Sequence, residues 1–154
     1  MIDHVCSHDH QVCIDEAVRS ATRLCQNRGA RLTDLRKQVL KLVWSSHKPI
    51  GAYDILNSLQ SQGRSGAPPT VYRTLDFLLE LGLVHRISSM NAYVGCPEPG
   101  RPHISQFFLC TACGIATELN NQSVNESIQA TAVEMDFKIQ DHTIEVSGLC
   151  SACQ

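Results

Sequence analysis

No stretch of this sequence is long and apolar enough to cross a membrane. A spanning helix needs roughly 18 consecutive apolar residues, and no run in the chain approaches that length. The start, Met-Ile-Asp-His, also lacks the basic segment and apolar stretch of a secretory signal. We therefore expect a soluble, cytoplasmic protein that has no membrane partner.

Aromatic residues are scarce, at 5% of the 154 residues, and the sequence contains no internal repeat. The other proportions, 43% hydrophobic and 18% charged, are ordinary for a globular chain of one domain or two small ones. No nucleophile motif is present, so we expect neither an enzyme nor a small-molecule substrate.

Cysteine, by contrast, is plentiful, with eight residues in the chain. In a secreted protein these thiols would indicate disulfides, whereas in a reducing cytosol they are better explained as metal ligands. The expected compartment and the expected metal support each other, and neither is independent evidence.

Charge is unevenly distributed along the chain. Residues 15–88 hold 11 Lys and Arg against 6 Asp and Glu, whereas residues 89–154 hold 2 against 7. A basic segment beside an acidic one indicates that one part of the protein meets a polyanion. The alternative is a chance distribution of charge over solvated faces.

Apolar periodicity predicts four helices and a β-hairpin in the first 95 residues. Thr33 is a suitable N-cap for the second helix, and the Pro68-Pro69 pair opens the fourth. Three or four short helices that end in a hairpin form a winged-helix pattern. The predicted helices span 15–27, 33–44, 52–62 and 68–81, and the strands 84–88 and 92–95, with a turn at 48–51.

The fourth helix has the character of a DNA-recognition helix. At about 100° per residue, the buried face is formed by Val71, Leu75, Leu78 and Leu79. This leaves hydroxyl, phenol and guanidinium groups exposed near the positive end of the helix dipole. Arginine is the side chain best suited to bidentate contact with guanine, although an isolated exposed arginine is usually only a solvated residue. The predicted DNA contacts are Arg31, Tyr53, Thr70, Tyr72 and Arg73.

The remaining chain predicts a tail at 1–14, a hinge at 96–102 and an α+β domain at 103–154. The hinge follows from three prolines and a glycine within seven residues. The predicted elements beyond it are strands over 104–109, 115–119, 137–141 and 143–149, and a helix over 124–135. The predicted fold class is therefore α+β, with a winged-helix domain over 15–95 followed by this smaller domain.

Two Cys-x-x-Cys knuckles, at Cys110/Cys113 and Cys150/Cys153, give the most specific signal in the chain. Two residues between cysteines let both sulfurs reach one tetrahedral zinc, and four thiolates form a closed structural site. Gly114 permits the tight turn beneath the first knuckle. The alternatives are a redox dithiol or two disulfides, but a thioredoxin-like motif needs one pair in a βαβ context.

Other potential ligands occur near the hinge and in the tail. His85, Cys96, His103 and Glu118 lie around the hinge, where each taken alone has an ordinary structural explanation. The tail contains His4, Cys6, His8, His10 and Cys13, which could capture zinc, although a disordered segment without affinity is the preferred interpretation.

The order of these motifs resembles the ferric uptake regulator family over roughly residues 16–153. The resemblance is carried by Arg-Leu-Thr-Asp-Leu-Arg (31–36), Ala-Tyr-Asp-Ile-Leu (52–56), Pro-Pro-Thr-Val-Tyr-Arg-Thr-Leu-Asp-Phe-Leu-Leu-Glu (68–80), Gly-Leu-Val-His (82–85) and the two knuckles. It implies a homodimeric repressor that binds operator DNA, with the second domain forming the dimer.

The resemblance further implies a regulatory zinc site at His85, Cys96, His103 and Glu118, and thus about two zinc ions per subunit. A donor set with a thiolate suits zinc, whereas a ferrous sensor would favour imidazoles and carboxylates. His142 falls where family members often have an auxiliary ligand, but it is equally well explained as a surface residue. Asp34 and Leu35 depart from the family pattern of Pro and Gln after the helix-start threonine, which puts the DNA-backbone contacts there in doubt.

The expected mechanism is that zinc bound around the hinge orients the two winged-helix heads of a dimer for adjacent half-sites. Three alternatives remain: an iron, manganese or peroxide sensor of the same family, a zinc-dependent hydrolase, and a zinc buffer that uses the tail. The hydrolase is disfavoured because catalytic zinc keeps an open position, and the buffer leaves the recognition helix unexplained.

Overall fold

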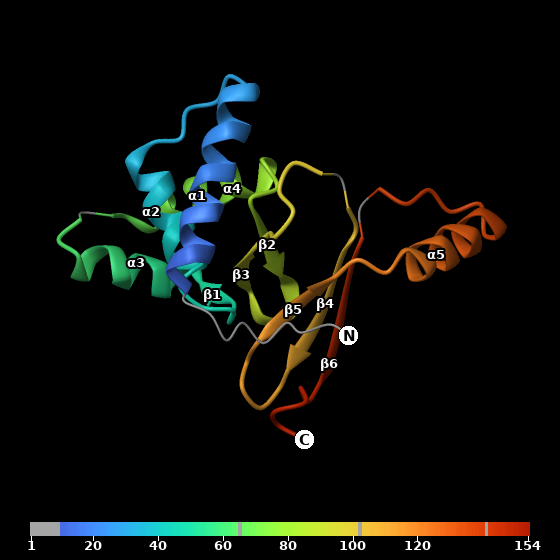
Figure 1. Ribbon diagram of the computed structural model, residues 1–154. Coiled ribbons are helices and arrows are strands. Elements are labelled where there is room, and N and C mark those ends of the chain that lie inside the picture. The colour runs from blue at the N-terminus through green and yellow to red at the C-terminus, as the bar shows by residue number, and fades with distance from the viewer. Residues whose placement is uncertain (1–9, 65, 102, 141) are drawn as a thin grey trace. The chain divides into compact units, whose positions relative to one another are not determined.

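The computed structural model describes residues 10–64, 66–101, 103–140 and 142–154 (Figure 1). The chain divides into two compact units after Arg101. None of the helices in the described ranges is long and apolar enough to span a membrane. The predicted tail residues His4, Cys6 and His8 lie outside the described ranges.

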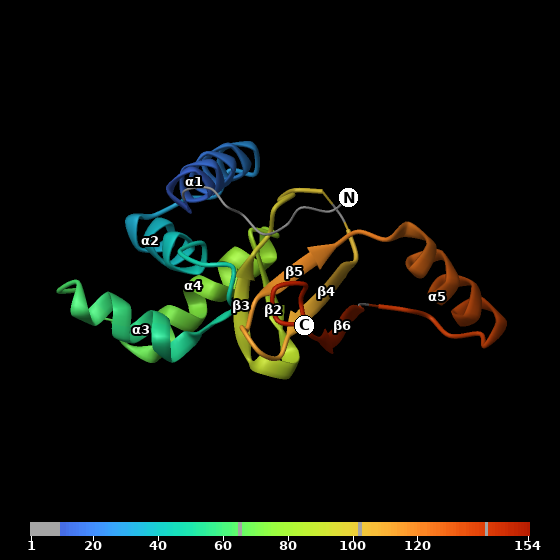
Figure 2. The same cartoon turned by 60° about the horizontal axis from the view of Figure 1, so that its bottom comes forward.

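Four helices form most of the first unit, and they lie together in both views of the ribbon (Figures 1 and 2). They are α1 (His10–Asn27), α2 (Asp34–Val43), α3 (Ala52–Ser61) and α4 (Pro68–Glu80). The Thr33 side chain accepts a hydrogen bond from the Arg36 backbone N–H at 3.4 Å, which confirms the predicted N-cap of α2. Leu40, Ile55, Leu59 and Leu75 are fully buried at the centre of the core.

Helix α1 begins at His10, five residues before the predicted start at Asp15, so residues 10–14 are not part of a tail. Ile14 and Ala17 are half-buried and extend the apolar stripe of the helix toward its start. The Gln11 side chain donates a hydrogen bond to the Asp15 carboxylate at 2.9 Å, one turn along the helix. The polar neighbours of residues 10–14 concealed this continuation in the sequence.

A three-stranded antiparallel sheet completes the first unit, in the order β1-β3-β2. The hairpin strands β2 (Val84–Ile87) and β3 (Ala92–Gly95) are confirmed, and a 3₁₀ turn over Ser88–Met90 joins them. Strand β1 (Ile50–Gly51) was predicted to be part of a turn, because two residues are too few to show alternation. Antiparallel pairing with β3 holds these two residues in an extended conformation, and Ile50 pairs with Tyr93.

The second unit contains β4 (Ser105–Cys110), β5 (Ala116–Leu119), α5 (Gln122–Glu134) and β6 (Thr143–Gly148). Its sheet has the order β5-β4-β6, and β4 runs antiparallel to β5 but parallel to β6. This agrees with the predicted α+β class. The Asn121 side chain caps α5 by accepting a hydrogen bond from the Val124 N–H at 3.3 Å.

The strand predicted over Phe137–Asp141 is wrong for residues 137–140, which form no strand, and Asp141 lies outside the described ranges. The end of α5 explains the difference. Asp136 adopts a left-handed backbone conformation (φ 52°), and the Phe137 N–H bonds back to the Ala132 carbonyl at 2.8 Å. This bond stops the helix, and none of the described strands pairs with the segment that follows.

Within the second unit, α5 extends away from the three-stranded sheet rather than lying across its face, as Figures 1 and 2 both show. Only Ala132 of this helix is buried. The apolar side chains of Val133, Met135 and Phe137 are 79%, 72% and 65% exposed. The unit therefore carries apolar surface that this chain by itself does not cover.

Gly95 offers a test of the packing in the first unit. A Cβ atom at this position would overlap the indole of Trp44, so we expect Gly95→Ala to lower the free energy of unfolding by about 1–3 kcal/mol. Urea unfolding followed by circular dichroism measures the change. Gly148→Ala is the control, because no atom lies within 4 Å of its added carbon. Equal stability of the two variants would contradict the packing described.

Candidate metal centres and DNA-contacting helix

Parallel pairing of β4 with β6 brings the two cysteine knuckles together. Cys110 is the last residue of β4 and pairs with Gly148, the last residue of β6. The Thr111 N–H donates to the Gly148 carbonyl at 2.9 Å, which holds the chain ends beside each other just beyond the strands. Cys150 follows two residues later, so the two knuckles, which 36 residues of chain separate, become neighbours.

Each knuckle is a hydrogen-bonded turn. The Gly114 N–H donates to the Cys110 carbonyl and the Cys153 N–H to the Cys150 carbonyl, both at 2.9 Å. Gly114 has a φ of +75°, which a residue without a Cβ adopts at little cost. The glycine predicted to lie beneath the first knuckle is therefore required there by its backbone conformation.

The four sulfur atoms of Cys110, Cys113, Cys150 and Cys153 lie within 4.8 Å of one another. The Cys113 and Cys150 sulfurs are 3.8 Å apart, and all four residues are thiols rather than disulfides. In a tetrahedron with metal–sulfur bonds of about 2.3 Å, neighbouring sulfurs are about 3.8 Å apart. The cluster thus has the donor atoms and the spacing of a four-thiolate metal site.

Two thiols of this cluster have pKa values that are shifted in opposite directions. Backbone N–H groups of Cys113 and Cys150 hydrogen-bond the Cys110 sulfur and lower its pKa to about 6. The crowded sulfurs of Cys150 and Cys113 raise the pKa of Cys153 to about 12. The Cys110 thiolate is therefore stabilised at neutral pH, whereas ionisation of Cys153 there requires a cation.

In the first unit, His85 and Cys96 are neighbours across the β2–β3 hairpin. The Cys96 N–H donates to the Leu83 carbonyl at 3.0 Å, which extends the ladder by one residue beyond β3. Because Leu83 lies opposite Cys96, His85 is its diagonal neighbour on the same face of the hairpin. Cys96 is buried, with 2% exposure, and His85 is half-buried.

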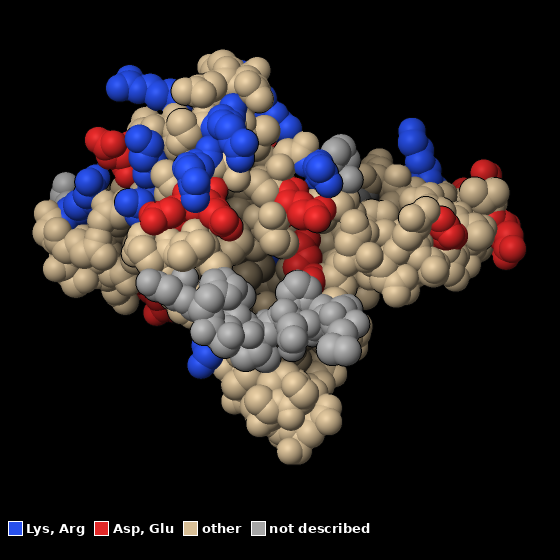
Figure 3. Space-filling model, in the orientation of Figure 1, with Lys and Arg blue, Asp and Glu red and all other residues tan. Residues whose placement is uncertain are grey.

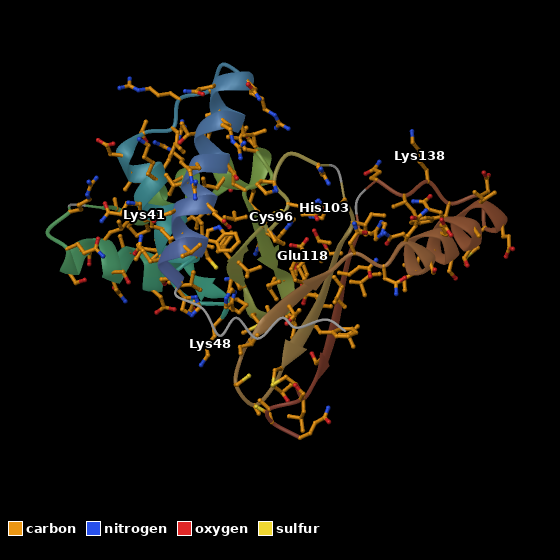
Figure 4. The ribbon with its side chains drawn as sticks, in the orientation of Figure 1. Lys41, Lys48, Cys96, His103, Glu118 and Lys138 are labelled. Atoms are coloured by element: carbon orange, nitrogen blue, oxygen red, sulfur yellow. The ribbon has the colours of Figure 1, made fainter. Side chains whose placement is uncertain are left out.

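In the second unit, His103 and Glu118 form a close pair (Figure 4). The imidazole donates from Nε2 to the Glu118 Oε1 atom at 2.8 Å, and the two side chains are only 12% and 9% exposed. Glu118 is positioned by β5, where it pairs with Phe107 of β4. A nitrogen and an oxygen this close could both bind one cation once the imidazole proton is displaced.

Helix α4 presents the predicted surface. Val71, Leu75 and Leu78 are at most 1% exposed and point into the core, whereas Leu79, predicted to share this face, is only half-buried. The three side chains predicted to face DNA, Thr70, Tyr72 and Arg73, are all exposed. Because Pro68 and Pro69 occupy the first turn, they also remove two of the N–H groups that would otherwise lack helical partners there.

The two other predicted DNA contacts lie on neighbouring elements. Tyr53, at the start of α3, is 64% exposed and lines a shallow groove together with Tyr72 of α4. Arg31 is exposed in the loop before α2, and its carbonyl accepts a hydrogen bond from the Arg36 side chain. On the face drawn in Figure 3, most of the visible Lys and Arg side chains lie on the first unit.

Two further side-chain contacts within the first unit were not predicted from the sequence. The Arg36 guanidinium lies over the Phe77 ring, 3.4 Å from its centroid, which fixes the side chain that holds the Arg31 loop. The His47 ring lies against His10 of α1, with ring centroids 4.9 Å apart. Both are contacts between segments distant in sequence, which periodicity within one helix does not reveal.

The first unit is a winged helix, a fold that many DNA-binding proteins use, and a thiol-bearing α+β unit follows it. The family model described as the ferric uptake regulator family matches residues 27–147. The chain belongs to the ferric uptake regulator family.

Among its relatives, the zinc uptake regulation protein of Escherichia coli strain K12 is 40% identical over 139 residues, which cover 90% of this chain and 81% of the relative. A solved structure of a zinc uptake regulator complexed with zinc and DNA is 39% identical, with a TM-score of 0.85 over 90% of this chain and 93% of that one. A structure described as holo XcZur is 41% identical, with a TM-score of 0.80 over 88% and 94% of the two chains.

The pKa of Cys110 predicts how many protons zinc displaces from the cluster. At pH 7.5 this thiol, with a pKa of about 6, is already a thiolate, and at pH 5 it is protonated. Cys153, with a pKa of about 12, is protonated at both. Zinc binding at the four-thiolate cluster, measured as the first equivalent added to the metal-free protein, should therefore release about one more proton at pH 5 than at pH 7.5. Calorimetry in buffers of different ionisation enthalpy counts the protons, and an unchanged number would contradict the assignment.

Proposed function

We propose that the protein is a zinc-responsive transcriptional repressor that binds operator DNA as a homodimer. The observation that carries the proposal is the likeness, at 39% identity and a TM-score of 0.85, to a zinc uptake regulator complexed with zinc and DNA. As a DNA-binding regulator it would act in the cytoplasm, on genes for zinc uptake. No catalytic role is proposed, because the donor sets offer four protein ligands and leave no open position on the metal.

The first zinc is proposed to be structural and bound by Cys110, Cys113, Cys150 and Cys153. The support is the spacing of the four sulfurs and the depressed pKa of Cys110. A zinc ion there would bind the end of β4 to the residues after β6, closing the sheet at the point where its parallel pair ends. Because closed four-thiolate sites contribute directly to folding, loss of this zinc would destabilise the second unit.

The second zinc is proposed to be regulatory and bound by His85, Cys96, His103 and Glu118. Each unit contributes two of these donors, and within its own unit each pair is already close together. The set contains one buried thiolate, two imidazoles and one carboxylate. Soft thiolate favours zinc over ferrous iron or manganese, which prefer nitrogen and oxygen donors.

Zinc at this second site would couple metal binding to DNA binding. The donors belong to units joined by the segment 96–102, so one ion bound to all four restricts the orientations that the winged helix can sample about this hinge. A coupling of this kind is typically about 1–3 kcal/mol per ligand. In a dimer the same restriction would set the spacing of the two recognition helices for adjacent half-sites.

The second unit, residues 103–154, is proposed to form the dimer. Its sheet has an apolar pair on an open face, since Phe108 of β4 pairs with Val146 of β6 and the two are 56% and 47% exposed. Burying such patches in a partner is the usual reason for their presence on a folded unit. Among the described residues of this unit, the large apolar side chains that are exposed are Phe108, Val124, Val133, Met135, Phe137, Val146 and Leu149.

The DNA contacts proposed for the first unit are Arg31, Tyr53, Thr70, Tyr72 and Arg73. Their exposure and the excess of Lys and Arg over Asp and Glu in residues 15–88 support this surface. Arg73 is the candidate for direct reading of a base, because its guanidinium can bond both major-groove acceptors of guanine. The two tyrosines are suited to phosphate contact or to packing on thymine methyl groups.

A titration of DNA binding against buffered free zinc, iron and manganese tests the proposal, with Cys96→Ser in parallel. We expect zinc to promote binding to palindromic operator fragments and the variant to lose about 5- to 150-fold of that effect. Cys25→Ser is the matched control, because Cys25 is equally buried in the same unit but outside the proposed site. A normal zinc response in Cys96→Ser, or an equal response to iron or manganese, would favour another metal sensor of the family.

Replacing Arg73 by Ala should weaken operator binding by about 1–3 kcal/mol and relax base preference at one position of each half-site. Zinc binding should stay unchanged, since this side chain contributes no proposed ligand. Lys138→Ala, an exposed cation in the second unit, is the control and should leave affinity unaltered. Gel-shift or anisotropy titrations at fixed salt measure both, and equal losses in the two variants would count against α4 as the reading helix.

A further inference from the structure

The loop between α1 and α2 carries Arg31, one of the proposed DNA contacts, and its residues 30–33 belong to no helix or strand. Backbone hydrogen bonds hold the two ends of this loop. The Ala30 N–H donates to the Cys25 carbonyl at 2.9 Å, and the Lys37 N–H donates to the Thr33 carbonyl at 3.0 Å. Arg31 lies between these ends and is exposed, so packing in the core does not fix its position.

The side chain of Arg36, in the first turn of α2, contacts the loop at this point. Its guanidinium donates from Nη1 to the Arg31 carbonyl at 2.5 Å. A charged donor makes a stronger hydrogen bond to a carbonyl than a neutral donor does. The backbone N–H of Arg36 also donates to the Thr33 hydroxyl at 3.4 Å. One residue of α2 therefore holds the loop at two places.

The Arg36 side chain is itself held by α4. Its guanidinium carbon lies 3.4 Å from the centroid of the Phe77 ring, and Phe77 is half-buried against the core. A planar guanidinium can stack on an aromatic face and still donate from its edge. Because Phe77 and Arg73 belong to the same helix, the two contacts of Arg36 link the helix that carries Arg73 to the loop that carries Arg31.

We propose that Arg36 is a positioning residue for DNA binding, which fixes the main chain of Arg31 relative to α4. The inference rests on the proposed function. Phosphate contacts set the register of a protein on the duplex, whereas base contacts read the sequence. Arg36 would thus set the distance between a phosphate contact at Arg31 and the base contact of Arg73. Its own guanidinium is half-buried between a ring and a carbonyl, so it is assigned no contact with DNA.

Backbone ¹⁵N relaxation of the full-length, zinc-loaded protein tests the fixing of Arg31 without DNA. We expect an order parameter of about 0.85 for the Arg31 amide in the native sequence and below about 0.6 in Arg36→Met. Methionine keeps an apolar side chain against Phe77 but has no donor. Lys41→Met is the matched control, because it removes an exposed cation from the same helix and should leave the Arg31 value unchanged (Figure 4).

The salt dependence of operator binding tests the consequence for DNA. Arg31→Ala should lower the slope of log affinity against log salt by about 0.9 for each subunit bound, the value of one phosphate contact. Arg36→Met should lower it by no more than this, and should have no further effect when combined with Arg31→Ala. Arg36→Lys should not restore the slope, because an ammonium lacks the planar donor group. Lys41→Met should leave the effect of Arg31→Ala intact.

Unchanged circular dichroism shows that each variant folds, and Phe77→Leu, which keeps the arginine but removes the ring, is a second variant that should also mobilise Arg31. The proposal is overturned if the Arg31 order parameter is unchanged in both Arg36→Met and Phe77→Leu. It is also overturned if Arg36→Met lowers the slope further in the Arg31→Ala background, or if Arg36→Lys binds DNA as the native sequence does. Mobilisation of Arg31 in a protein whose native sequence binds no DNA would count against the proposed function only.

Discussion

The parallel pairing of β4 with β6 is the constraint on which the second unit depends. It places Cys110 beside Gly148 and so brings two knuckles separated by 36 residues to one point. The turn hydrogen bonds then direct four sulfurs inward, with 3.8 Å between Cys113 and Cys150. A parallel pair has no short turn to fix its register, so a metal at the end of the strands would supply the constraint that a hairpin obtains from its loop.

Much of the first unit could be predicted because its signals are local. The Thr33 cap, the prolines that begin α4 and the apolar stripe of α4 each specify structure within a few residues, and all three were confirmed. Strand β1 was missed because its conformation depends on pairing with β3. The start of α1 was missed because the sequence there is rich in polar residues, which obscure the apolar stripe of the helix. The prediction of a strand was wrong for residues 137–140, because an alternation of apolar and polar residues does not by itself supply a neighbouring strand to pair with.

The candidate sites also differ in whether a local sequence pattern predicts them. Cys-x-x-Cys spacing predicts the four-thiol cluster without knowledge of the fold, since two residues between cysteines are sufficient to place both sulfurs on one metal. Residues such as His85 and Glu118 have no local signature and were identified by resemblance to a family. The contact between His10 and His47 has neither a local motif nor a family precedent in the sequence, and only the packing of α1 near the α2–β1 turn reveals it.

The central claim is that zinc and operator DNA bind to the same conformation of the protein and therefore strengthen each other. Thermodynamic reciprocity requires that operator DNA increase zinc affinity by the factor by which zinc increases DNA affinity. The most direct test is the zinc dissociation constant of the protein, already loaded at its four-thiolate cluster, with and without operator DNA. The account predicts tighter zinc binding on DNA, by about 5- to 150-fold. Identical zinc affinity in the two conditions would contradict it.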